Sequence, residues 1–525
     1  MLVLAASLPT LAAVWLLLAP GVVLSREMTW DLLFALAGAW HLAHGHVPHV
    51  DFHTPFGVLG FALTSWGFTL LGPTVHAFLV GELIVLAGGF VAAVIVAARR
   101  LSPVPAFLFV VYIALLILQP SNLGDAPYAY SFAMSYNRWG WAALTTLCLA
   151  LFIAPHPTAR QPWLDLTLTT LLVAFLFYLK LTFAVAAMAA VVAAIVTVPH
   201  LREQWRVWTG LVTVLGVAQM GPWNHSYFRD AWDSDYERTD LAAHLNTLLG
   251  GRFEYALYLI VILTLAWLWQ RRWATREAVI SAGVLTGLGM LVLSQNAQSG
   301  DIPLGLVVTL ILYQSLRSLA RNTRMFRRSE VVTLFVLVLV PMILSIATAT
   351  KVLAGYYRAA TRQETLAMPQ ATNLRGLAVP ASSHSVAEAL AASGHRLLSS
   401  PRVPPLRDPV TQAEYVASLL EAATALAENP VTVLVLDQVN PMPFVLGYRP
   451  PRGGRLWLSP EEPPPAAADV FDDVQVVLIP KYSSYAPVTA FALATYGDYL
   501  GREFAVRSET PSWVILRRGV AANRQ

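Results

Sequence analysis

Charged residues and cysteines are both scarce in this chain. Of its 525 residues, 13% are charged and 56% are hydrophobic, whereas a soluble globular domain carries about 25% charged residues. The mean hydropathy of +0.56 excludes an ordinary soluble protein and indicates one that crosses a membrane several times. Cys148 is the single cysteine, which excludes an intramolecular disulfide and a cysteine-based zinc site.

Lysine is nearly absent as well. Lys180, Lys351 and Lys481 are the three in the chain, and arginine supplies the remaining positive charge. Because the arginines form short clusters between apolar runs, the net charge of +4 fits membrane orientation better than nucleic-acid binding. We therefore expect no nucleic-acid partner. The apolar run 1–24 lacks a basic start and a clear cleavage signal, so we predict a retained first helix.

About eleven apolar segments approach the roughly 17–25 residues that span a bilayer. They are 2–24, 74–98, 104–119, 138–155, 163–180, 182–199, 207–222, 253–270, 276–294, 302–320 and 330–350. The arginine clusters share the cytoplasmic side if residues 56–71 form an interfacial or re-entrant helix instead of spanning the membrane. Residues 1–350 then form a transmembrane domain with a cytoplasmic N-terminus. Its outer-face loops are 25–73, 120–137, 223–252 and 295–301.

The apolar runs end near residue 350, and residues 351–525 read as a separate soluble α/β domain. Strand-like segments 431–437, 474–480, 502–508 and 512–518 alternate there with helix-like segments 383–397, 410–428 and 486–500. An odd number of spans places this domain on the outer face. The predicted fold is therefore a polytopic α-helical membrane protein of about eleven transmembrane helices with a C-terminal soluble α/β domain, and this domain would be periplasmic.

The first outer loop concentrates ionisable residues beside the membrane. Asp31 begins a predicted helix, where it could act chemically or simply stabilise the helix start. Asp51 follows a turn that can return a second carboxylate to the same surface, or it is a turn aspartate. Five histidines, among them His53, leave a divalent metal open as a cofactor, but only His41 and His44 have helical spacing, so no metal ligands are predicted.

The other outer loops offer groups that suit a phosphorylated or hydroxylated ligand. Tyrosines there also fit an aromatic belt at the membrane interface. Arg138 is predicted at the outer end of a span, where a guanidinium can bind phosphate bidentately. Lys180 is predicted at an outer turn, where it would either snorkel or meet a lipid phosphate. The candidate substrate-binding residues are Glu27, His53, Asp125, Tyr128, Tyr136, Arg138, Lys180, His225 and Asn296.

The acid after the first span and the turn that follows it resemble the first outer loop of the GT-C superfamily of polyprenyl-phosphate-dependent glycosyltransferases. The matching residues are Asp31, Gly45, Pro48, Asp51 and Phe52. The likeness is greatest to bacterial members similar to protein O-mannosyltransferases and lipid A aminoarabinose transferase. Many such enzymes have adjacent Asp and Glu residues after the first span, whereas here Glu27 precedes Asp31 by four positions.

This resemblance implies a transferase of the bacterial inner membrane that works on cell-envelope glycans. It would move a sugar from a polyprenyl-phosphate donor to a hydroxyl of a glycan, lipid or protein on the periplasmic face, by an inverting single displacement. Asp31 would be the base, Asp51 would position the acceptor or stabilise the sugar cation, and Lys180 or Arg138 would neutralise the phosphate. The alternatives are a transporter or flippase, and a non-catalytic glycan-assembly protein.

Overall fold

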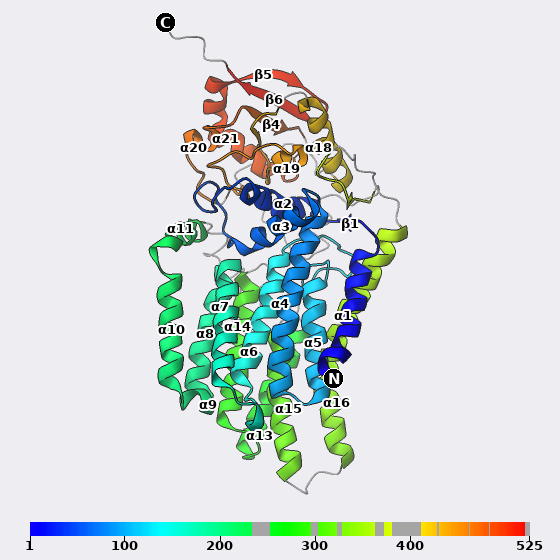
Figure 1. The fold of residues 1–525 in the computed structure, drawn as a ribbon, viewed down its shortest axis with the longest axis vertical. Helices are drawn as coiled ribbons and strands as arrows, with labels where there is room; N and C mark the ends of the chain where they lie inside the picture. The colour runs from blue at the N-terminus through cyan, green and yellow to red at the C-terminus, as the bar shows by residue number, and fades with distance from the viewer. Residues whose placement is uncertain are drawn as a thin grey trace.

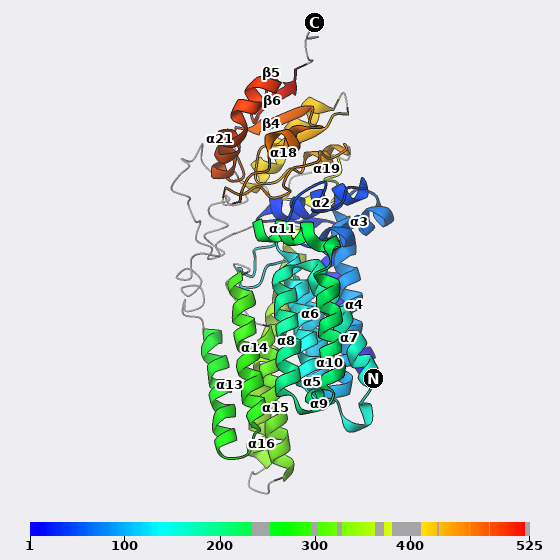
Figure 2. The ribbon, with the colours of Figure 1, turned by 90° about the vertical axis from the view of Figure 1, so that its left-hand side faces the viewer.

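Three layers stack along the long axis of the computed structural model (Figures 1 and 2). A helical bundle forms the first layer, short helices lying across the bundle form the second, and an α/β region forms the third. The structure describes residues 1–233, 253–295, 303–322, 328–362, 372–380, 411–427, 430–460, 462–481 and 483–519.

Each of the predicted apolar segments forms a helix of the bundle. These helices are α1 (Leu2–Leu18), α4 (His76–Arg100), α5 (Pro103–Leu118), α6 (Ser135–Phe152), α7 (Pro162–Leu179), α8 (Leu181–Thr197), α10 (Trp205–Gln219), α13 (Phe253–Gln270), α14 (Arg276–Gln295), α15 (Leu304–Asn322) and α16 (Arg328–Arg362). Short turns η1 (Pro157–Ala159), α9 (Pro199–Arg202) and η2 (Pro222–Asn224) connect some of them.

Several described helices have the length and composition of membrane spans. Four of them are long and apolar enough to cross a bilayer, namely His76–Arg100, Pro162–Leu179, Arg276–Gln295 and Leu339–Arg362. The chain is therefore a helical membrane protein, while the number of eleven spans stays a prediction. Helix α16 continues to Arg362, past the predicted domain boundary at 350, and that boundary also stays a prediction.

The middle layer holds α2 (Thr29–Ala43), α3 (Leu59–Leu71) and α11 (His225–Asp233). Helix α3 has 13 residues, too few to span a bilayer, and it lies across the bundle axis (Figure 2). Its position relative to the membrane stays a prediction. It packs closely on α4, because a Cβ added at Gly67 would lie 2.2 Å from the carbonyl oxygen of Ala77. Glycine there allows the two helices to approach.

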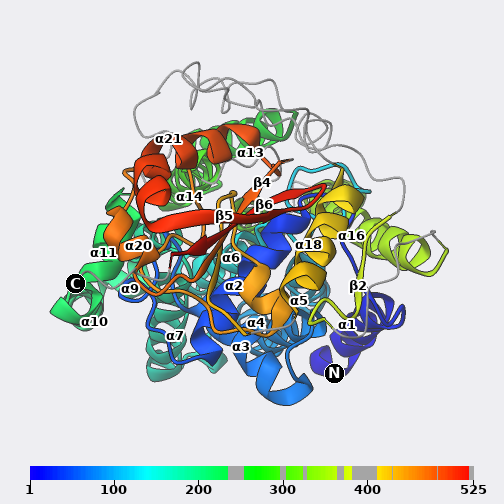
Figure 3. The same ribbon diagram turned by 90° about the horizontal axis from the view of Figure 1, so that it is seen from above.

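The third layer is built on a four-stranded sheet of order β3-β4-β6-β5. Its strands are β3 (Val433–Val435), β4 (Val476–Pro480), β5 (Phe504–Glu509) and β6 (Trp513–Arg518), and its helices are α18 (Gln412–Leu426), α19 (Met442–Leu446), α20 (Ala467–Phe471) and α21 (Ala486–Glu503). Strands β3 and β4 are parallel, and the other pairs are antiparallel. Helices α18 and α21 flank the sheet (Figure 3). The four predicted strands are confirmed, and the predicted helix 383–397 lies outside the described residues.

Two short strands join the outer layers to the bundle. Strand β1 (Val23–Leu24) follows α1 and pairs in parallel with β2 (Leu377–Ala378), which comes after α16 in the chain. The register aligns Val23 with Leu377. The beginning of the first outer loop is therefore fixed to the C-terminal region by backbone hydrogen bonds.

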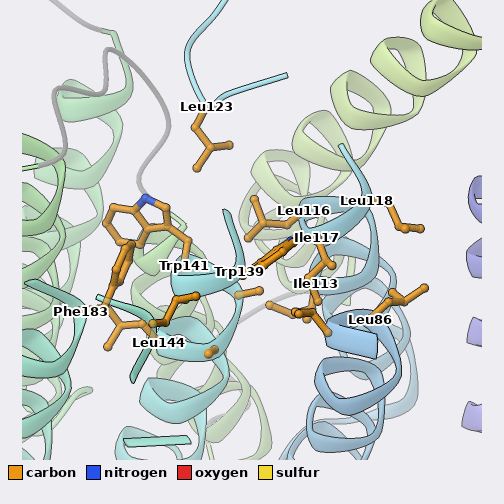
Figure 4. Close-up of a cluster of buried hydrophobic side chains, with 14 of the residues drawn as sticks. Leu86, Ile113, Leu116, Ile117, Leu118, Leu123, Trp139, Trp141, Leu144 and Phe183 are labelled. Carbon is orange, nitrogen blue, oxygen red and sulfur yellow. The ribbon is translucent and has the colours of Figure 1, made fainter. Parts of the chain in front are cut away.

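Helix α6 fills the centre of the bundle with large aromatic residues. Trp139 and Trp141 are almost fully buried, and Trp141 packs edge-on against Phe183 of α8 with their ring centroids 5.6 Å apart (Figure 4). Gly140 lies between these tryptophans and lets the Phe183 ring approach the α6 backbone. This packing fixes the position of α6 in the bundle, and with it the position of the first turn of α6 next to the outer loops.

A buried ion pair joins α4 to α6 just below these loops. Arg138 Nη2 lies 3.4 Å from Glu82 Oε1, and both side chains are 0% exposed. Arg138 Nη1 also donates to the carbonyl oxygens of Ser121 and Ala133. Arg138 thus lies near an end of α6, and its guanidinium is directed into protein and holds the second outer loop in place. That this end faces outward stays a prediction.

We expect Glu82→Gln to destabilise the protein by about 3 kcal/mol, because it leaves a buried guanidinium without a counter-charge. Tm in detergent should fall clearly below that of the wild type. Glu203→Gln, which changes an exposed glutamate at the C-terminal end of α9, should leave Tm unchanged. Equal Tm values for the two variants would contradict this role of Glu82.

Candidate active site

Helix α2 begins with an unusual backbone and a cap from a distant part of the chain. Its N-cap, Met28, has φ +50° and supplies no side-chain cap. Instead, the Thr29 N–H donates to Gln412 Oε1 at 2.8 Å, across 383 positions of sequence. Since the N–H groups of a first turn need acceptors, Gln412 takes the capping role that Asp31 might have had. The Asp31 side chain is therefore not needed to cap the helix.

The Asp31 carboxylate instead faces the second outer loop and the start of α8. Its side chain is buried, and it accepts a hydrogen bond from the backbone N–H of Met134. Burial raises the pKa of Asp31 to about 7, while the Met134 hydrogen bond and the positive charge of Lys180 act in the opposite direction. A carboxyl group with this pKa can both hold and release a proton near neutral pH.

Lys180 occupies the break between α7 and α8, as the sequence predicts. The residue is half-buried, and its ammonium end is enclosed by protein. Nζ lies 5.3 Å from the ring centroid of Phe56, 5.1 Å from that of Tyr136, and 3.5 Å from Asn137 Oδ1. Burial lowers the pKa of Lys180 to about 7, and the Asp31 carboxylate opposes this shift. The ammonium is therefore held beside the acid rather than extended toward water.

Asp125 brings a further carboxyl group to the same place. Burial raises its pKa to about 7, and the negative charges of Glu27 and Asp31 add to the increase while Arg138 counteracts it. Its Oδ1 is buried and accepts no hydrogen bond from the described residues. Tyr136 is close enough to Asp31 for that carboxylate to influence its hydroxyl. Glu27, Asp125, Tyr136 and Lys180 are thus gathered around Asp31.

The backbone around Asp31 adopts strained conformations. Met28, Phe132 and Met134 all have φ between +50° and +53°, in the left-handed region that non-glycine residues rarely adopt. Met28 precedes α2, and Met134 precedes α6 and supplies the N–H that reaches Asp31. Such strain costs about 1–3 kcal/mol per residue and collects at functional sites. Its presence on both sides of Asp31 supports a functional assignment.

Asp51 lies apart from this group. Its Oδ2 accepts from the Val47 N–H at 2.7 Å within its own turn, and its Oδ1 lies 3.6 Å from Arg452 Nε. The Gly453 N–H donates to the Asp51 carbonyl oxygen. The structure therefore directs Asp51 toward the C-terminal region and not toward Asp31, because the turn that contains it packs beneath residues 452–456. The catalytic role expected for Asp51 stays a prediction.

The remaining candidates are dispersed. His53 bonds to Asp230 of α11 through Nδ1 at 2.9 Å. Tyr128 is exposed, with the Arg26 guanidinium over its ring, and His225 is exposed at the start of α11. Asn296 lies outside the described residues. The substrate-binding roles of all four stay predictions.

Three residues that support this arrangement, Glu82, Asp230 and Gln412, are not among the candidates predicted from the sequence. Glu82 is a lone acid in an apolar run, and that isolation could have identified it as a buried partner. Asp230 and Gln412 carried no comparable signal, because their partners are far away in the sequence.

The histidines pair differently from the expected helical spacing. His41 Nδ1 lies 3.1 Å from His46 Nδ1, and the His44 ring packs against Trp40. Among the residues that the structure describes, no three His, Cys, Asp or Glu side chains converge as metal ligands.

No family model and no curated protein matches this chain. Among solved structures, it is similar to the crystal structure of ArnT from Cupriavidus metallidurans in the apo state, at 13% sequence identity over 97% of each chain and with a TM-score of 0.47. The likeness is one of fold and assigns no chemistry to this chain.

Gln412→Ala should remove the cap of α2 and cost about 1 kcal/mol of stability. We expect faster hydrogen exchange at residues 29–32, measured by mass spectrometry in detergent or nanodiscs. Gln204→Ala is the matched control, because Gln204 also precedes a helix, α10, but caps it with no side-chain hydrogen bond. Unchanged exchange at 29–32 in Gln412→Ala would show that α2 does not depend on this contact.

Proposed function

We propose that this chain is a membrane glycosyltransferase that moves a sugar from a polyprenyl-phosphate donor to a hydroxyl acceptor. One observation carries the proposal: the buried carboxylate of Asp31 and the enclosed ammonium of Lys180 influence each other at the outer end of the helical bundle. We further propose that this face is periplasmic in a bacterial inner membrane, and that the acceptor is a glycan, lipid or protein of the cell envelope.

Glycosyl phosphates need a base and a counter-charge more than a strong acid. In the proposed step, Asp31 takes the proton of the acceptor hydroxyl as its oxygen attacks C1 of the sugar. The bond from C1 to the phosphate oxygen breaks, and its electron pair leaves with the phosphate. Lys180 neutralises that charge, and such preorganised electrostatics is commonly the largest contribution to catalysis. A single displacement of this kind inverts the anomeric centre.

The structure changes how the two cations are assigned in this proposal. Arg138 is committed to Glu82 and to two carbonyl oxygens, so we treat it as a positioning residue for the second outer loop. Lys180 becomes the proposed phosphate partner. Asp125 is close enough to both Glu27 and Asp31 for their charges to interact. We propose that these carboxyl groups accept hydrogen bonds from sugar or acceptor hydroxyls.

The depth of these groups argues for an enzyme over a transporter. Glu82 lies in the second turn of α4 and Arg138 in the first turn of α6. Lys180 lies in the break between α7 and α8, and Asp31 lies in the first turn of α2. Transport coupled to charged residues requires them near mid-membrane depth. A non-catalytic assembly protein would not need a buried Asp31 near Lys180, nor strained backbone around Asp31.

Asp31→Asn should lower sugar transfer by about 10²–10⁴-fold, because an amide cannot accept the acceptor proton. The measurement is transfer of radiolabelled sugar from a polyprenyl-phosphate donor by purified protein. Asp498→Asn, at an exposed position of α21, should retain wild-type activity. A folded Asp31→Asn protein with near-wild-type transfer would exclude Asp31 as the base.

The rate of transfer should rise from pH 5.5 to about pH 7 and fall again at higher pH. The pKa of Asp31 is raised to about 7, so the carboxyl group is protonated and inactive as a base below that value. Burial lowers the pKa of Lys180 to about 7, so the lysine loses its positive charge above that value. A carboxyl group of ordinary pKa would already be ionised at pH 5.5, and the rate would then not rise between pH 5.5 and pH 7. Initial rates at saturating donor across this range distinguish the two, and the residual activity of Asp31→Asn should lack the acidic limb.

A further inference from the structure

Asp230 of α11 binds two histidines of the first outer loop. Its Oδ2 lies 3.0 Å from His49 Nδ1 and its Oδ1 lies 2.9 Å from His53 Nδ1, and the Thr54 N–H also donates to Oδ2 at 3.3 Å. The Asp230 side chain is 4% exposed. Burial acts to raise the pKa of Asp230, but the two histidine hydrogen bonds outweigh it and leave that pKa below its ordinary value. We call Asp230, His49 and His53 the α11 clasp.

The clasp is connected to the turn that carries Lys180. Directly after His53, the Thr54 hydroxyl oxygen accepts from the Phe56 N–H at 3.3 Å, and the Phe56 ring lies beside Lys180 Nζ. The next residue, Gly57, donates its N–H to the carbonyl oxygen of Leu179 at 3.0 Å. A Cβ on Gly57 would lie 2.0 Å from the Tyr178 carbonyl oxygen, so this approach admits only glycine.

A second connection runs through α11 itself. The Tyr227 ring stacks on His49 with centroids 4.7 Å apart, and the Tyr227 hydroxyl donates to the carbonyl oxygen of Phe177 at 3.1 Å. The Phe177 and Tyr227 rings also pack edge-on, with centroids 5.6 Å apart. Helix α11 therefore contacts the end of α7 directly and, through the first outer loop, contacts it again.

From these contacts we infer that Asp230 is a positioning residue for Lys180. By holding His53 and Thr54, it sets the path of residues 54–57. This segment in turn places the Phe56 ring beside Lys180 Nζ and binds the carbonyl oxygen of Leu179, the residue before the lysine. This inference deepens the proposed function and rests on it for its catalytic consequence. A displacement of about 1 Å at a reacting group can cost about 10²-fold in rate, so a residue that fixes the lysine matters without touching substrate.

The test uses Asp230→Asn in the full-length protein reconstituted in nanodiscs. Because an amide cannot accept from both imidazoles and the Thr54 N–H as a carboxylate does, kcat/KM for the polyprenyl-phosphate donor should fall about tenfold. KM for the acceptor should stay within twofold of wild type. Asp233→Asn, on the same helix, is the matched control and should leave both parameters unchanged. A loss shared equally by donor and acceptor parameters would overturn the inference.

A double-mutant cycle separates positioning of Lys180 from general destabilisation. In a Lys180→Met background, Asp230→Asn should lower the residual rate by less than twofold, since the group that it positions is already gone. A further tenfold loss in that background would overturn the inference. If Asp230→Asn does not fold, His53→Ala tests the same link, with a smaller expected loss because His49 still binds Asp230.

Hydrogen exchange gives a reading that is independent of catalysis. The N–H groups of Gly57 and Lys180 donate to Leu179 and Leu176, so peptides covering 54–58 and 177–181 should exchange faster in Asp230→Asn than in Asp233→Asn. If the wild-type protein transfers no sugar, the proposed function fails while this measurement still decides the positional link. Equal exchange in the two variants would overturn the link itself.

Discussion

The proposed site depends on two buried ionisable groups, the carboxyl group of Asp31 and the amine of Lys180, that are close enough for their charges to interact. Removing either charge from water costs several kcal/mol, and their mutual attraction offsets this only if their geometry is held. Asp31 is presented by α2, and Lys180 by the break between α7 and α8. These elements are far apart in the chain, so most of the outer architecture can be understood as the means of fixing their relative position.

Three long-range contacts provide that fixation from different sides. Gln412 holds the start of α2, the pair of Arg138 and Glu82 holds the loop whose Met134 N–H reaches Asp31, and Asp230 holds the segment beside Lys180. Each contact uses a buried polar group whose loss leaves a partner unsatisfied. Weakening any one of them should therefore affect the site more than the single hydrogen bond would suggest.

Sequence patterns predict the architecture well because they report local properties. The apolar segments coincide with the bundle helices, residues within 56–71 form the short helix α3, and the four strands lie where alternation places them. Asp31, Asp125 and Lys180 were also identified, since an ionisable group beside an apolar run is costly unless it is used. The same reasoning could not tell that Asp51 faces Arg452, because turn chemistry fixes a local bend and not the direction in which it packs.

The sequence does not reveal which residues far apart in the chain contact each other. Gln412 and Thr29 are separated by 383 positions and His53 and Asp230 by 177, and neither spacing belongs to a helix or a strand. The first of these pairs joins the C-terminal region to the helix that carries Asp31. Residues 453–456 pair with Asp51 and His53, and Gln412 caps the helix of Asp31. The outer α/β region thus covers the first outer loop, which is held between this region and the bundle. The cover keeps the buried carboxyl group of Asp31 near Lys180, although the polar groups of the loop would otherwise favour contact with water.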